Sequence, residues 1–225
     1  MGNTWFYELI FEETKLFTSE LFGQVLSVAK EQAYKLRYPT YVADPDEVDA
    51  LEFYDVETLS TYICSQGGHF TVWREEEGIL LGFYPSERYI GLGIQYNLRK
   101  DRDEQISLDL ENLFLAFCQN FQPSCGYCDD EWSLEIIFPR ELAENWGKFQ
   151  SNILKQEPPM LLFWINYFST TYFSKIGEWR FEELQLSKLV TTREHGVFMY
   201  LAASPWDIEH AILGEDGKYH LIEIT

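Results

Sequence analysis

The chain has 225 residues, and its hydrophobic content of 46% and aromatic content of 17% are sufficient for a large buried core, which excludes a disordered chain. Its 37 acidic residues against 17 Lys and Arg give a net charge of −20. A field of that sign repels nucleic acid and anionic lipid, so we expect neither as a partner, and a basic protein is favoured.

The first part of the chain predicts a strand followed by two helices. Residues 4–13 have the composition of a strand, and a helix over 18–36, capped by Thr18 or Ser19, presents one apolar face. A second, shorter helix is predicted over 55–66, and the glycines at 67 and 68 end it.

Three strands are expected next, as an antiparallel meander. Residues 69–74 and 79–84 flank an acidic turn, and 89–96 alternates between apolar and small or polar positions. The apolar positions of the last strand, expected to point into the core, are Ile90, Leu92 and Ile94.

The second half of the chain mixes both kinds of element. A long helix over about 104–121 carries a core stripe, and the continuously apolar residues 160–168 predict a central strand buried on both faces. The other predicted elements are a loop at 124–132, a strand at 132–138, helices at 139–154, 170–176 and 179–186, a strand at 196–202, and a last strand after a turn at 215–217.

This mixture of helices and antiparallel strands predicts an α+β fold, with an antiparallel or mixed sheet on which the helices pack. The chain contains no internal repeat, low-complexity tract or linker, so we expect a single compact domain over residues 1–225. Two tightly packed halves, 1–122 and 123–225, are the alternative division.

Negative charge is concentrated between Asp44 and Glu57. This segment contains seven acids and no base, and no Lys or Arg occurs between Arg37 and Arg74. Aromatic residues lie among the acids, as in interfaces that combine electrostatic steering with aromatic anchors. We therefore expect a partner-binding surface that includes Asp44, Asp46, Glu47, Asp49, Glu52, Phe53 and Tyr54.

A second acidic and aromatic stretch, SCGYCDDEW, covers residues 124–132 and is expected to be an exposed loop. We predict that it lies on the same side of the protein as the first segment. The alternative is that the two segments are solvated on unrelated faces while their aromatic residues belong to the core. The partner-binding residues expected in this stretch are Asp129, Asp130, Glu131 and Trp132.

The cysteines do not define a redox or metal site. Cys125 and Cys128 precede three carboxylates, which raise a thiol pKa and oppose redox catalysis. With Cys118 they offer three zinc ligands, and the fourth would have to come from Cys64 or a distant histidine. We expect buried thiols, no metal and no cofactor.

The N-terminal sequence MGNTWFYELIFEETKL contains no secretory signal, and Phe6 occupies the position at which a myristoylation signal needs a hydroxyl residue. We therefore expect a cytoplasmic protein with reduced cysteines. The longest apolar run, 160–165, is far shorter than the roughly 20 residues that cross a bilayer.

Motifs of the common catalytic sites are absent from the sequence. It has no nucleophile elbow, phosphate-binding loop or HExxH, and the four histidines lack ligand spacing. A non-catalytic protein is therefore expected. The alternatives are an acidic regulatory or scaffold module and a hydrolase whose pocket is assembled from dispersed carboxylates.

A succession of features over residues 123–207 is shared with one known family. They are an acidic aromatic loop ending at Trp132, the break Pro158-Pro159, an aromatic strand at 162–169, Ile176-Gly177, and the strand 196–201 before Ser204-Pro205. In this order they resemble bacterial polymorphic-toxin immunity proteins. The resemblance implies a small cytoplasmic inhibitor without catalytic activity that binds a co-produced toxin, and it assigns no contact residue. The negative charge of the chain separately favours a basic toxin or effector as the partner.

Overall fold

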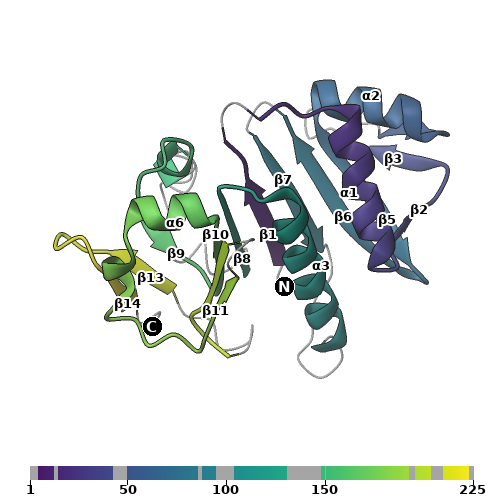
Figure 1. Cartoon of the computed structure of the whole chain (residues 1–225). Helices are drawn as coiled ribbons and strands as arrows, with labels where there is room; N and C mark the ends of the chain where they lie inside the picture. The colour runs from purple at the N-terminus through teal and green to yellow at the C-terminus, as the bar shows by residue number, and fades with distance from the viewer. Residues whose placement is uncertain are drawn as a thin grey trace.

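A large antiparallel sheet is the framework of the protein (Figure 1). The computed structural model describes residues 5–12, 15–42, 50–85, 88–94, 104–130, 148–149, 151–192, 196–203 and 210–222. Within these residues the sheet has nine strands, which are in spatial order β11 (Lys188–Thr192), β12 (Gly196–Tyr200), β10 (Ile165–Phe168), β8 (Cys125–Asp130), β1 (Trp5–Ile10), β7 (Tyr89–Ile94), β6 (Glu77–Tyr84), β5 (Gly68–Arg74) and β2 (Lys35–Leu36). The predicted α+β class is confirmed.

The predicted meander is present as β5, β6 and β7. These strands pair in sequence order and antiparallel, with Phe70 opposite Leu81 and Leu81 opposite Leu92. Ile90 is completely buried, as predicted. The side chains of Leu92 and Ile94 lie outside the described residues.

Three helices cover one face of the sheet: α1 (Ser19–Glu31), α2 (Val56–Gln66) and α3 (Glu104–Phe121). Figure 1 shows α1 and α3 in front of the strands. The expected cap of α1 is present, because the Thr18 hydroxyl accepts a hydrogen bond from the Leu21 amide at 3.2 Å. The apolar faces of all three helices share one core with the strands beneath them.

The first helix is shorter than predicted. It ends at Glu31 and not at 36, because Ala33 takes a left-handed conformation with φ of 68°. The next residues pair as β2 with the edge of the meander, Lys35 opposite Trp73. Pairing with the sheet overrides the helical periodicity that continues to Leu36 in the sequence.

The apolar stretch 160–168 is a strand with a bend in it. Its first part, β9 (Leu161–Leu162), pairs with β13 (His210–Leu213) in a small sheet completed by β14 (Tyr219–Ile222). Asn166 fixes the bend, since its side chain accepts from the Phe163 amide at 2.9 Å and donates to the Phe163 carbonyl at 2.6 Å. The second part, β10, is buried on both faces between β12 and β8, as predicted for a central strand.

The junction of β1 with β8 makes the large sheet continuous across residue 122. Trp5 pairs with Asp130 and Ile10 with Cys125, so strands from 1–122 lie on one side of the junction and strands from 123–225 on the other. A second hydrophobic core lies on the other face of the large sheet, over strands β8, β10 and β12. It lies against α6 (Thr170–Ile176), the 3-10 helix η1 (Glu178–Phe181) and the small sheet.

Some elements differ from the sequence prediction or were not predicted. The helix expected at 179–186 is the single 3-10 turn η1. Strands β2, β11, β13 and the hairpin of β3 (Thr40–Val42) and β4 (Leu51–Phe53) were not predicted, because short strands depend on partners remote in sequence. The strand expected at 132–138 lies outside the described residues, and of the helix expected at 139–154 the described residues 148–149 and 151–154 are helical.

Candidate protein-binding site

The second acidic stretch is not a surface loop. Residues 125–130 form β8, which lies between β1 and β10 in the middle of the large sheet. Tyr127 and Asp129 are completely buried, so the expectation of an exposed partner-binding Asp129 is wrong. The other predicted residues of this stretch, Asp130, Glu131 and Trp132, have side chains outside the described residues.

A charge in a sheet interior needs a partner, and Asp129 has one. The Nε2 atom of His210 on β13 donates to Oδ2 of Asp129 at 2.5 Å, and both side chains are completely buried. Next to this pair on the same face of β8, the Tyr127 hydroxyl donates to the carboxylate of Glu8 on β1. These contacts explain how β8 accommodates acidic and hydroxyl groups inside the protein.

In a Ser-His-Asp catalytic triad a buried Asp orients the His, and Asp129 and His210 form a pair of this kind. The surroundings of this pair, however, do not favour catalysis. Nδ1 of His210 is buried and has no hydrogen-bond partner among the described residues, so no described hydroxyl or thiol is positioned there as a nucleophile. Both side chains are closed off from solvent. The pair joins the small sheet to the large one.

The first acidic segment contains an exposed β-hairpin. Strands β3 and β4 pair antiparallel, with Thr40 opposite Phe53, Tyr41 opposite Glu52 and Val42 opposite Leu51. Because side chains alternate along a strand, Val42 points into the core while Tyr41 and Glu52 share the outer face. Figure 1 places β3 beside α2, away from β8. Because residues 43–49 and 131–132 lie outside the described residues, the expectation that the two acidic segments share one side of the protein stays a prediction.

The predicted residues of this segment fall into two groups. Glu52 and Tyr54 are exposed, whereas Phe53 is half-buried and packs on Tyr62 of α2 with ring centroids 5.3 Å apart. Phe53 therefore anchors the hairpin to the helix. The four acids between β3 and β4, which are Asp44, Asp46, Glu47 and Asp49, lie outside the described residues.

Two tyrosines hold the carboxylate of Glu52. The Tyr41 hydroxyl donates to Oε1 at 3.1 Å, and the Tyr54 hydroxyl donates to Oε2 at 2.7 Å. The same hydrogen bonds raise the pKa of both phenols above the usual value. Tyr41 is 55% exposed and Tyr54 is 68% exposed, so an acidic group and two aromatic rings face solvent together.

The surface around Glu52 is aromatic and acidic. Four of the ten large hydrophobic side chains exposed in the described residues, Tyr38, Tyr41, Tyr54 and Val56, fall within 38–56. Burial and then the charge of Asp55 raise the pKa of Tyr38. We call Tyr38, Tyr41, Glu52, Tyr54 and Val56 the hairpin patch. Sequence analysis missed Tyr38 and Tyr41, although their position just before the acidic segment was visible.

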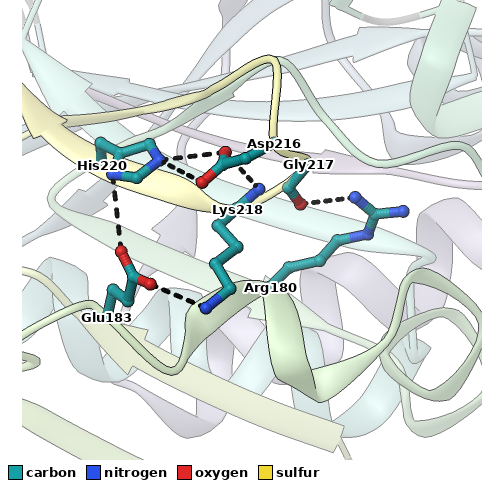
Figure 2. Close-up of polar contacts among 6 residues, drawn as sticks. All are labelled: Arg180, Glu183, Asp216, Gly217, Lys218 and His220. Atoms are coloured by element: carbon teal, nitrogen blue, oxygen red, sulfur yellow. Dashed lines mark hydrogen bonds and ion pairs between the residues drawn. The ribbon is translucent and has the colours of Figure 1, made fainter.

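A second exposed polar cluster contrasts with the hairpin patch because one of its acids, Glu183, forms an ion pair with Lys218 (Figure 2). Lys218 donates to Glu183 at 2.7 Å, and Nε2 of His220 lies 3.1 Å from both carboxylate oxygens of Asp216. Arg180 donates to a backbone carbonyl of the β13–β14 turn. The cluster fastens this turn to η1, and Lys218 compensates the charge of Glu183.

A cleft of about 480 Å³ lies between the β5–β6 turn and the start of α3. Its lining residues are Arg74, Glu75, Glu76, Glu77, Gln105 and Asp109. Arg74 forms ion pairs with Glu77 at 3.1 Å and with Asp109, and its guanidinium lies 5.2 Å from the ring centroid of Tyr34. The Arg74 guanidinium therefore already pairs with two of the four carboxylates that line this cleft.

The cysteines are thiols without disulfides, and their placement is that of core residues. Cys118, Cys125 and Cys128 are buried, and Cys64 is half-buried. Burial raises the thiol pKa of Cys118 and Cys125, which opposes the thiolate form. Among the described residues no group of three or more His, Cys, Asp and Glu side chains is placed to hold a metal ion.

No family model and no curated protein matches the chain. Among solved structures, the chain is similar to a protein described as Pseudomonas aeruginosa T6SS protein PA0821, with a TM-score of 0.43 and 13% sequence identity over 91% of this chain and 68% of the other. In the part of the chain that the structure describes, none of the helices combines the length and apolar character needed to cross a bilayer.

Proposed function

We propose that this chain is a non-catalytic, acidic, cytoplasmic binding protein that captures a basic protein through the hairpin patch. The observation that carries the proposal is the exposed carboxylate of Glu52 between two exposed tyrosines, within a segment of seven acids and no base. Within this class we propose an immunity-type inhibitor of a co-produced toxin, which is what the resemblance of residues 123–207 implies.

The chemistry of the hairpin patch suits such a role in two ways. A net charge of −20, with no Lys or Arg from 38 to 73, attracts a cationic partner and raises the association rate at low salt. Exposed tyrosines add rigid contact area at a low entropic cost and slow dissociation. Electrostatic capture and aromatic anchoring therefore come from the same few residues.

A hydrolase remains the second candidate, because the cleft at Arg74 is lined by carboxylates. We rank it lower since Glu77 and Asp109 both contact the Arg74 guanidinium, and this arrangement is that of a structural ion-pair network. Arg74 also lies over the Tyr34 ring, which holds it in the cleft. A hydrolytic activity abolished by Asp109→Asn would favour this second function.

The test uses the protein encoded next to this chain in its genome. If that neighbour is toxic when expressed alone, co-expression of this chain is expected to restore growth. With the purified pair, Glu52→Lys should slow association roughly tenfold at low salt, and the effect should shrink as salt screens the charges. Thermal stability should hardly change, because Glu52 is exposed.

Glu178→Lys is the matched control, because it makes the same change in net charge at an exposed position of η1, remote from the hairpin. It should slow association much less than Glu52→Lys. An association rate that responds neither to salt nor to Glu52→Lys would overturn electrostatic capture through the hairpin patch.

A further inference from the structure

The Glu52 carboxylate is held in place from two sides. Tyr41 is the cross-strand neighbour of Glu52, and Tyr54 follows β4, so the two phenols approach different oxygens of one carboxylate. A glutamate on a surface strand normally samples several rotamers. Here two donors restrict it, and the carboxylate is oriented before any partner arrives.

This oriented carboxylate still has accepting capacity. An ionised carboxylate can accept about four hydrogen bonds, and the two phenols use one site on each oxygen. Within the described residues no Lys, Arg or His forms an ion pair with Glu52. Glu183, by contrast, is paired with Lys218. Glu52 is therefore an exposed anion whose charge the described chain leaves uncompensated.

We propose that Glu52, Tyr41 and Tyr54 form a recognition site for an arginine side chain of a basic protein partner. The inference rests on the proposed function and adds the chemistry that the partner must present. The guanidinium donates one hydrogen bond to each oxygen of Glu52, and its plane lies against an exposed tyrosine ring.

Arginine fits this arrangement better than lysine. Its planar fork of N–H donors matches both oxygens of a carboxylate at once, whereas a lysine ammonium acts as a compact point charge. Guanidinium groups also stack on aromatic rings and are more weakly hydrated than ammonium groups. A carboxylate flanked by two aromatic rings selects for these properties, while diffuse negative charge attracts both cations equally.

The test compares two short peptides of equal charge, one alternating arginine with glycine and the other alternating lysine with glycine. Calorimetric titration of the wild-type chain should show the arginine peptide binding about fivefold to tenfold more tightly. Glu52→Gln should remove most of this preference. Glu52→Asp keeps the charge but withdraws the carboxylate from the phenols, so the lysine affinity should stay while the preference for arginine falls.

Glu57→Gln is the matched control, because Glu57 is exposed in the same acidic segment and contacts neither tyrosine. It should weaken both peptides slightly and equally, leaving the preference intact. Tyr54→Ala should lower arginine affinity more than lysine affinity, and circular dichroism of each variant confirms that it is folded.

The outcomes separate this inference from the function on which it rests. Equal affinity of the wild-type chain for the two peptides overturns the arginine site but leaves electrostatic capture standing. A preference for arginine that survives Glu52→Gln also overturns it, because the selectivity then lies elsewhere. Binding of neither peptide at low salt overturns both proposals.

Discussion

Nε2 of His210 on β13 lies 2.5 Å from Oδ2 of Asp129 on β8, and both side chains are completely buried. This contact joins the small sheet to the centre of the large sheet across 81 residues of sequence. Within the acidic stretch 125–130, the Asp129 carboxylate therefore stabilises the core and is not exposed to a partner.

Removing one member of this pair should strongly destabilise the fold. Asp129→Ala leaves a buried histidine without its acceptor, and loss of one partner of a buried pair typically costs about 3–5 kcal/mol of unfolding free energy. Urea denaturation measures this change. A cycle with His210→Ala should show coupling, whereas Glu57→Ala on the surface should have little effect. A stable Asp129→Ala protein would show that the pair is dispensable.

Gly126 lies where the Phe114 ring of α3 closely approaches β8. A Cβ added at Gly126 would lie 3.0 Å from Cζ of Phe114 and 3.2 Å from the Glu8 carbonyl oxygen, so Gly126→Ala should lower the unfolding free energy by about 1–3 kcal/mol. The matched change Gly23→Ala, in an exposed position of α1 with nothing within 4 Å, should instead raise it by about 0.5–1 kcal/mol. Thermal melts of both variants test these opposite signs.

The N-cap of α2 should give a pH-dependent contribution to stability. Hydrogen bonding from the Thr58 amide lowers the pKa of Asp55 in the folded state, so its contribution is fully present above the unfolded pKa of about 4 and is lost as pH falls through the folded value. Asp55→Ala should therefore lower Tm at pH 7 and much less at about pH 3. An equal loss of Tm at both values would contradict an ionic cap.

Thiol labelling should distinguish the cysteines by burial. Cys64 is half-buried, whereas Cys118, Cys125 and Cys128 are buried within the cores. In the native protein a thiol reagent should modify Cys64, and mass spectrometry should find the other three modified after unfolding in denaturant. One equivalent of zinc in chelator-free protein, or rapid native labelling of Cys125, would contradict their assignment as core thiols.

Local patterns were sufficient for most of the framework. The cap at Thr18, the apolar stripe of α3, the turn between β5 and β6 and the alternation of β7 each depend on residues close in sequence. Periodicity, capping and turn residues therefore predicted these elements. The hairpin patch was partly visible in the same way, because the run of acids without a base around Glu52 is a property of the sequence itself.

What the tertiary structure decided depends on partners far apart in the chain. The sequence alone determined the α+β class, the strong negative charge and the acidic segment that contains Glu52. Tertiary structure decided that Asp129 is buried, because its hydrogen-bond partner His210 lies on another sheet. It also decided that Tyr41 lies opposite Glu52, because strand pairing sets the register. Burial of a charge and the register of short strands are set by such remote contacts, which hydrophobic periodicity does not encode.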